Sequence, residues 1–133
     1  MITAVDTSVL LDVFTANPTF LEASQNVLRR VLHEGSILIC EVVLAELRPC
    51  FASRRTLGHA LETLGAEYAP ISQEAASLAG ETWARYRGAG GKRDRRIPDF
   101  LVAAHAAVSA DRLLTRDRGF YRRWFRNLRI LEP

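Results

Sequence analysis

The sequence ITAVDTSVLLDVF, residues 2–14, contains the features that decide the fold. Its first four residues are a short apolar run, which indicates a buried strand. Asp6 follows directly, and an apolar segment with helical spacing then continues until Asn17 and Pro18 break it. A strand that passes through a polar turn into a helix is typical of an α/β fold with a parallel sheet.

The rest of the chain repeats this alternation of short apolar runs and longer amphipathic segments. Further strands are predicted at residues 37–40, 68–71, 113–114 and 128–131. The run at 68–71 is assigned to an edge of the sheet, because Pro70 has no N–H to donate. The pattern predicts a three-layer α/β/α sandwich with a mostly parallel central sheet, formed by a single domain of residues 1–133.

Capping residues predict where several helices begin and end. Thr19 stands three residues before Glu22, which is the spacing of a capping box, and Gly35 is expected to close that helix. By similar reasoning, three further helices should start near Ser53, Ser72 and Pro98. Residues 88–96 combine glycines with a run of charged side chains, so they predict a loop.

Composition and charge limit the class of protein. The longest uncharged stretch, residues 100–110, is too short to span a bilayer, and no signal peptide is evident, so we expect a cytoplasmic protein without membrane attachment. The two cysteines are too few for a disulfide framework. Residues 92–129 contain eleven Lys or Arg against four Asp or Glu. This basic segment suggests a surface for nucleic acid, although a solvated charged face would give the same pattern.

Four acidic residues stand at or near the carboxyl ends of predicted strands, where open parallel sheets bind ligands. Asp6 ends the first strand, and Asp117 follows the strand at 113–114 by a short turn. Glu46 lies on the helix after the second strand, and Asp99 starts the helix after the basic loop. Carboxylates in such positions favour hard cations such as Mg²⁺, which take oxygen ligands.

Each acid also has a purely structural explanation. Asp6 could cap a helix, Asp99 could complement the dipole at a helix N-terminus, and Asp117 could form a turn. Glu46 differs, because it lies within the apolar helix of residues 42–47 that Pro49 should end. A charge buried there without a partner would be costly, and a metal ion would serve as that partner.

Four short motifs in sequence order resemble those of the PIN-domain ribonucleases, in particular the VapC-type toxins of bacterial toxin–antitoxin pairs. VDTSVLLD (5–12) resembles the first motif of the family, and LAEL (44–47) resembles the second. PDFLVAAHA (98–106) is similar to the third motif, and LTRDRGF (114–120) is similar to the fourth. Any one of these patterns is weak, but the four together cover nearly the whole chain on the expected elements.

The resemblance implies a PIN-like fold and an endoribonuclease that hydrolyses RNA phosphodiester bonds with Mg²⁺ or Mn²⁺. Its metal and catalytic residues would be Asp6, Glu46, Asp99 and Asp117, assisted by the hydroxyl of Thr115, with Ser8 as a further helper. As partners it implies RNA, a cognate antitoxin and a second copy of the chain in a homodimer. The chain departs from the family pattern in its very basic loop at 88–96 and in Arg116, and both departures concern substrate choice.

Arginines of the basic segment are the candidates for binding the RNA backbone, because phosphate contacts position a nucleic acid. We assign this role to Arg93, Arg95, Arg96, Arg116 and Arg118. The aromatic side chains of residues 120–125 could stack on bases, but packing in a core or dimer explains them better.

Other chemistries fit the sequence less well. The three histidines lack metal-ligand spacing, no serine or cysteine lies in a nucleophile motif, and residues 88–91 lack the features of a phosphate-binding loop. An aspartyl-phosphate phosphatase needs a second acid two residues after Asp6, where Ser8 stands. The remaining alternative is a non-catalytic RNA-binding or regulatory module, whose acids only cap helices and turns and which would bind no metal.

Overall fold

The structure is a computed structural model that describes residues 1–93 and 95–133, so Asp94 of the predicted loop lies outside the described residues. Five strands of the described residues form one sheet in the order β3-β2-β1-β4-β5, with each neighbouring pair parallel. The strands are β1 (Ile2–Val5), β2 (Ser36–Ile39), β3 (Ala66–Tyr68), β4 (Arg112–Leu114) and β5 (Ile130–Leu131). The predicted α/β fold with a parallel central sheet is confirmed.

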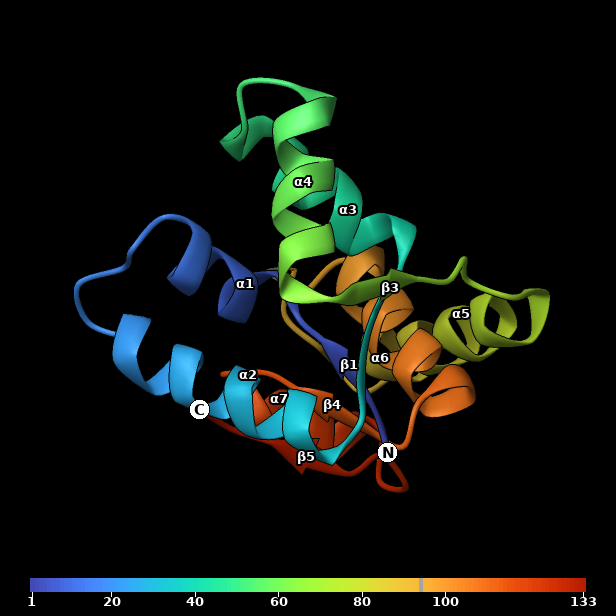
Figure 1. The fold of residues 1–133 in the computed structure, drawn as a ribbon. Helices are drawn as coiled ribbons and strands as arrows, with labels where there is room; N and C mark the ends of the chain where they lie inside the picture. The colour runs from blue at the N-terminus through green and yellow to red at the C-terminus, as the bar shows by residue number, and fades with distance from the viewer. Residues whose placement is uncertain (94) are drawn as a thin grey trace.

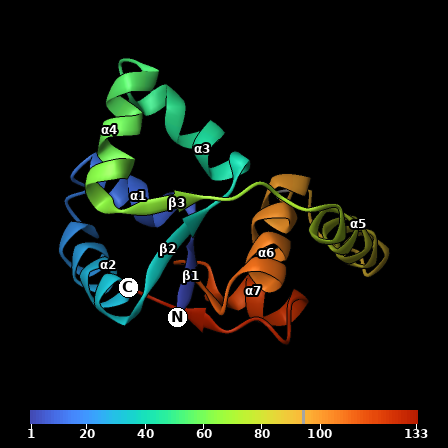
Figure 2. The same ribbon diagram turned by 45° about the vertical axis from the view of Figure 1, so that its right-hand side comes forward.

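Helices cover both faces of this sheet. They are α1 (Thr7–Phe14), α2 (Leu21–Glu34), α3 (Glu41–Leu47), α4 (Arg54–Leu64), α5 (Gln73–Gly88), α6 (Ile97–Ser109) and α7 (Arg118–Trp124), with a 3₁₀ turn at Arg48–Cys50. Figure 2 shows α1 and α2 on one side of the sheet and α5 and α6 on the other, which gives the three predicted layers. In Figure 1, α3 and α4 project beyond the carboxyl ends of the central strands.

The central position of β1 brings the two ends of the sequence together. The side chains of Ala4 and Val5 are buried, and Val5 lies opposite Leu114 of β4 in the parallel ladder. The chain continues this pairing past the strands, because the Asp6 amide donates a hydrogen bond of 2.9 Å to the Leu114 carbonyl. Residues that directly follow β1 and β4 therefore lie side by side at the carboxyl ends of these strands.

Helix α6 is buried around most of its circumference, because it lies between the sheet and α5. Its buried residues are Phe100, Val102, Ala103, Ala104, His105 and Ala106. The small alanine side chains allow both neighbours to approach closely, and the helix contacts β1, β4 and α3 as well as α5. The first turn of α6 carries Asp99, which lines the same cleft as Asp6 at the end of β1.

Several predicted helix ends are confirmed, and one is wrong. Ser53 and Ser72 cap α4 and α5 by accepting backbone N–H bonds, as predicted. The predicted capping box of Thr19 is absent from α2, since Asn17 Oδ1 accepts the N–H groups of Thr19 and Phe20 at 2.9 and 3.1 Å. An Asn can bond its own backbone two or three residues further on, and here it does so ahead of the threonine.

Gly35 closes α2 as predicted, and the chain next to it explains why a glycine stands there. Its amide donates to the Val31 carbonyl at 3.0 Å, while its backbone is extended at φ 163°. A side chain at this position would overlap the carbonyl of Met1, which passes directly beside it. Glycine is therefore required here by the close approach of the chain that leads into β1.

The edge strands are shorter than predicted or shifted by a few residues. Strand β3 starts at Ala66 and ends before Pro70, because proline cannot continue the hydrogen-bonded ladder. Strand β5 is reduced to Ile130–Leu131, and both strands lie at edges of the sheet. No helix within the described residues is long and apolar enough to cross a membrane.

Candidate active site

All four acids singled out from the sequence line one open cleft at the carboxyl ends of the central strands. The cleft has a volume of about 460 Å³. Its walls are formed by Asp6, Thr7, Ser8, Leu11, Glu46, Asp99, Arg116, Asp117 and Tyr121. These residues come from the β1–α1 junction, α3, the start of α6 and the β4–α7 junction, so the fold gathers them from four separate parts of the chain.

Asp6 is held by two hydrogen bonds, one to each carboxylate oxygen. Its Oδ1 accepts the Thr7 amide at 2.8 Å and so caps α1, while its Oδ2 accepts the Thr115 hydroxyl at 2.8 Å. Burial raises the pKa of Asp6 above 3.8, and the negative charges of Glu46 and Asp99 add to that effect, although both hydrogen bonds oppose it. Each oxygen of an ionised carboxylate retains a further lone pair for another ligand.

Thr115 connects the ends of β1 and β4. It is fully buried, and its amide donates to the Leu131 carbonyl at 3.0 Å, which fixes the turn after β4. The same hydroxyl that donates to Asp6 accepts the Asp117 amide at 3.1 Å. One side chain therefore bonds both the carboxylate of Asp6 and the backbone of Asp117.

The burial predicted for Glu46 is wrong, although its place at the cleft stands. The residue is exposed at the cleft wall, and its Oε1 accepts the Thr7 hydroxyl at 2.9 Å. Helix α3 buries Val43 and Leu47 instead, and Glu46 lies just off this face. The apolar run thus did not require a metal as a partner for a buried charge, because the charge faces the open cleft.

Asp99 lies in the first turn of α6 and is half-buried. Its Oδ2 accepts the Arg96 amide at 3.4 Å, so it also contributes to the helix end as the structural explanation requires. Pro98 occupies the first turn of α6, as predicted. Both Asp6 and Asp99 therefore combine a capping contact with a place in the cleft.

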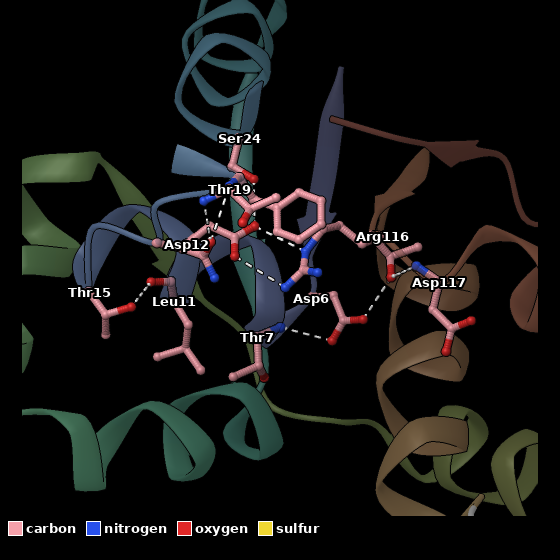
Figure 3. A network of polar contacts seen from close by, with 12 residues as sticks. Asp6, Thr7, Leu11, Asp12, Thr15, Thr19, Ser24, Arg116 and Asp117 are labelled. Carbon is pink, nitrogen blue, oxygen red and sulfur yellow. Dashed lines mark hydrogen bonds and ion pairs between the residues drawn. The ribbon is translucent and has the colours of Figure 1, made fainter. Parts of the chain in front are cut away.

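Asp117 forms an ion pair with Arg95 of the basic loop. The guanidinium carbon of Arg95 lies 4.1 Å from the centre of the Phe120 ring. The Asp117 carboxylate points away from Asp6 in Figure 3. Among residues 1–93 and 95–133, no three Asp, Glu, His or Cys side chains stand close enough to hold an ion in this arrangement.

The donor set of the cleft nevertheless fits a hard divalent cation. It consists of carboxylates and hydroxyls on four neighbouring segments, and such oxygens are the ligands that Mg²⁺ and Mn²⁺ take in proteins. Mg²⁺ usually keeps several waters and needs only one or two direct carboxylates, which an open cleft of this size allows. Reorienting the Asp117 side chain would bring a further carboxylate toward Asp6.

Tyr121 is a cleft residue that the sequence reasoning assigned only to aromatic packing. It is buried, and burial raises the pKa of its hydroxyl well above the usual value of a tyrosine, with the charges of Asp6, Asp99 and Asp117 adding to the rise. The residue stands four positions after Asp117, which directly precedes α7, and the Tyr121 amide donates to the Asp117 carbonyl at 3.4 Å. This spacing from Asp117 was the signal in the sequence that could have placed Tyr121 at the cleft. The packing role predicted for Phe125 is confirmed by its burial.

The five arginines assigned to RNA differ in their contacts and exposure. Arg93 and Arg96 are exposed, Arg95 pairs with Asp117, and Arg118 pairs with Glu132 at 3.1 Å. Arg116 lines the cleft, but its guanidinium bonds both oxygens of Asp12 at 3.1 Å.

The contact between Arg116 and Asp12 supports the fold, because the carboxylate of Asp12 is buried. Its side chain is 1% exposed and also accepts the Ser24 hydroxyl at 2.7 Å. The guanidinium carbon of Arg116 lies 4.0 Å from the centre of the Phe20 ring. Figure 3 shows this second network directly beside Asp6 and Asp117, so it supports the turn that carries Thr115 and Asp117.

The chain is a parallel α/β/α protein with an acidic cleft at the carboxyl ends of its central strands, and the side chains of that cleft suit a hard cation. The family model of the PIN domain matches residues 3–125, so the chain belongs to the PIN domain family. Proteins of this family are in general nucleases that use divalent metal ions. No curated protein sequence matches the chain at a significant level.

Solved structures with the same fold include chains of toxin–antitoxin complexes. VapBC2 from Rickettsia felis, bound to a promoter DNA fragment, is similar at 23% identity and a TM-score of 0.76, covering 99% of this chain and 98% of that chain. FitAcB from Neisseria gonorrhoeae has 21% identity, a TM-score of 0.71 and coverage of 98% and 96%. A toxin–antitoxin complex from Klebsiella pneumoniae has 18% identity, a TM-score of 0.63 and 86% coverage of each chain.

Proposed function

We propose that this chain is a metal-dependent endoribonuclease and the toxin of a type II toxin–antitoxin pair. The observation that carries the proposal is the cleft at the carboxyl ends of β1 and β4, which Asp6, Glu46, Asp99 and Asp117 line together. Membership of the PIN domain family supports a nuclease, and the toxin–antitoxin complexes with the same fold support an antitoxin as partner.

In this proposal the four acids and Thr115 are the catalytic residues. Asp6, Glu46, Asp99 and Asp117 supply carboxylate oxygens to Mg²⁺ or Mn²⁺, which in turn supplies Lewis-acid activation of water and neutralises charge at the phosphate. Thr115 keeps Asp6 and Asp117 in register through its two hydrogen bonds. Asp6 must be ionised to act, so its raised pKa should make activity sensitive to low pH.

RNA is the proposed substrate, bound by phosphate contacts from the basic segment. Arg93 and Arg96 are exposed, and Arg96 directly precedes the helix turn that carries Asp99. Cations placed at the cleft edge attract the backbone of a polyanion, while the acids stay available for the metal. We further propose a homodimer and a cytoplasmic location, and gel filtration of the purified chain tests the former.

One assay tests the proposal directly. Purified chain is incubated with total RNA and Mn²⁺, and discrete cleavage products are expected, with none in the presence of EDTA. Asp6→Asn should abolish the products, whereas Glu22→Gln, which removes one charge from the exposed first turn of α2, should not. Cleavage that persists in EDTA, or that survives Asp6→Asn, would contradict a metal-dependent site.

A second candidate is the non-catalytic RNA-binding or regulatory module. The capping contacts favour it, because Asp6 accepts the Thr7 amide and Asp99 accepts the Arg96 amide without any metal. This candidate predicts RNA binding without cleavage and no heat of binding when Mn²⁺ is titrated into the chain. The cleavage assay and the titration together separate the two candidates.

A further inference from the structure

Arg95 of the basic loop contacts one of the acids that line the cleft. Its guanidinium forms an ion pair with Asp117, and the Phe120 ring lies 4.1 Å from the guanidinium carbon. The Arg95 side chain is 26% exposed and that of Asp117 is 40% exposed. Arg95 is thus partly enclosed by the ring on one side and the carboxylate on the other.

Contacts with Tyr86 fix the start of the loop that leads to Arg95. The Tyr86 hydroxyl donates to the Lys92 carbonyl at 2.7 Å, and the Gly91 amide donates to the Tyr86 carbonyl at 2.9 Å. A Cβ at Gly91 would overlap the Tyr86 ring, so only glycine allows the loop to pack this closely. Tyr86 itself is buried, with its ring centre 5.2 Å from that of Trp124 on α7.

Arg95 is surrounded by negative charges that would also favour a bound metal cation. Burial disfavours its charge, but the hydrogen bond to Asp117 and the charges of Asp117 and Asp99 outweigh burial and raise its pKa. Without a cation, carboxylates that share a cleft repel one another. The guanidinium therefore supplies positive charge at the same carboxylate that the proposed metal would use.

We propose that Arg95 is an internal competitor of the divalent cation, holding Asp117 in the metal-free chain until a metal ion displaces it. This inference rests on the proposed metal-dependent function and adds regulation to it. While Arg95 holds Asp117, the cleft lacks one metal ligand, so the apparent affinity for the metal equals the intrinsic affinity multiplied by the fraction of chains in which Asp117 is released. The chain would then need a higher metal concentration than its carboxylates alone imply.

The main rival explanation is an ordinary surface ion pair, which contributes little to stability. Such a pair could alter the melting temperature, but it would not be coupled to the metal. Binding of Mn²⁺ alone, measured by isothermal titration calorimetry, distinguishes the two. If Asp117 is released in only 10 to 20% of metal-free chains, Arg95→Ala should bind Mn²⁺ about five- to tenfold more tightly than the wild type.

Matched variants separate displacement from a simple loss of charge. Arg93 stands two residues before Arg95, and its side chain is exposed. Arg93→Ala removes one positive charge as Arg95→Ala does, but it should change Mn²⁺ affinity less than about twofold. Arg95→Lys keeps the charge but loses the planar fork and the stacking on Phe120, so it should fall between Arg95→Ala and the wild type. All of these variants lie in a surface loop, and their melting curves should confirm that each chain is folded.

A second readout follows the contact itself. The side-chain Nε–H signal of Arg95 in ¹⁵N NMR, assigned by its loss in Arg95→Lys, should move during a Mg²⁺ titration with the midpoint of metal binding. Two results would overturn the proposed competition between Arg95 and the metal: equal Mn²⁺ affinity of the wild type and Arg95→Ala, or an Arg95 signal that stays unmoved while Mg²⁺ binds. Neither result would contradict the proposed nuclease function. Failure of both chains to bind Mn²⁺ would overturn the proposed metal-dependent function, and the competitor with it.

Discussion

The hydroxyl of Thr115 donates a hydrogen bond of 2.8 Å to Oδ2 of Asp6, although 109 positions separate the two residues in the sequence. The parallel pairing of Val5 with Leu114 creates this contact, since the residue after each strand emerges at the same edge. Because the same hydroxyl accepts the Asp117 amide, the Asp6 carboxylate and the backbone of Asp117 depend on one threonine side chain. This relationship leads to the first prediction.

Thr115→Val should lower RNA cleavage about ten- to a hundredfold, the usual effect of removing a group that orients a metal ligand. The lost hydrogen bond favoured the ionised form of Asp6, so its pKa should rise further above 3.8. Cleavage requires ionised Asp6, and the acidic limb of the pH–activity profile should therefore move to higher pH. Thr115→Ser keeps the hydroxyl and should retain the wild-type limb. An unchanged limb in Thr115→Val would remove Thr115 from the site.

Asp99→Asn should abolish cleavage while leaving the metal-free chain as stable as the wild type or more stable. The charge of Asp99 raises the pKa of Asp6, so its removal relieves repulsion within the cleft. It also removes an anionic oxygen from the metal, and added Mn²⁺ should raise the melting temperature less than in the wild type. If Asp99 only supports the start of α6, the variant should lose up to about 1 kcal/mol of stability and cut RNA normally.

Neutralising Arg93, Arg95 and Arg96 should weaken RNA binding and flatten its dependence on salt. Each lost phosphate contact lowers the slope of log K against log salt by about 0.7 for a single strand. Arg93 and Arg96 should account for most of the change, because Arg95 is paired with Asp117. Fluorescence anisotropy from low to moderate salt measures the slope. Alanine at the exposed Arg54 and Arg55 of α4 is the control, and an equal effect there would indicate unspecific attraction.

Expression of the chain alone should arrest bacterial growth, and co-expression of its cognate antitoxin should relieve the arrest. An antitoxin that blocks the site should present an arginine, whose fork can pair with two carboxylate oxygens of the cleft at once. Growth curves after induction measure the arrest, and Asp99→Asn expressed to the same level should be harmless. A folded wild-type chain that is tolerated at high expression would end the toxin assignment but not the nuclease assignment.

Arg116→Ala should destabilise the fold by about 2 kcal/mol, because it leaves the buried carboxylate of Asp12 without its counter-ion. Urea denaturation measures the loss. The double variant with Asp12→Ala should be less destabilised than the sum of the single variants, since the two groups contact directly. If Arg116 instead serves RNA alone, the variant should keep its stability and change only the salt dependence of binding.

Local patterns in the sequence were sufficient to predict the order of the strands and of the helices up to α6, whereas α7 was not predicted. The strands are short apolar runs, and Ser53, Ser72 and Pro98 mark helix starts through contacts within one turn. The start of α2 was mispredicted because Asn17 and Thr19 are both acceptors of backbone N–H groups, and spacing alone does not rank them. Such competition between neighbouring caps is settled by the path of the loop.

The contacts within the site depend on distances that a linear pattern does not contain. The four acids could be placed at one edge because parallel strands all end there. The exposure of Glu46 depends on how α3 is rotated about its axis, which the apolar run around it concealed. The pairing of Arg95 with Asp117 depends on the path of a loop, and that of Arg116 with Asp12 joins separate parts of the chain.

The strand order β3-β2-β1-β4-β5 has a consequence for the synthesis of the chain. During translation β1 can pair with β2 early, but its other edge stays open until β4 has left the ribosome. Thr115 and Asp117 follow β4, so the proposed cleft is complete only after β4 has been made and has paired with β1. A chain that stops before β4 therefore carries Asp6 without Thr115 and Asp117, and it lacks two residues of the proposed nuclease site.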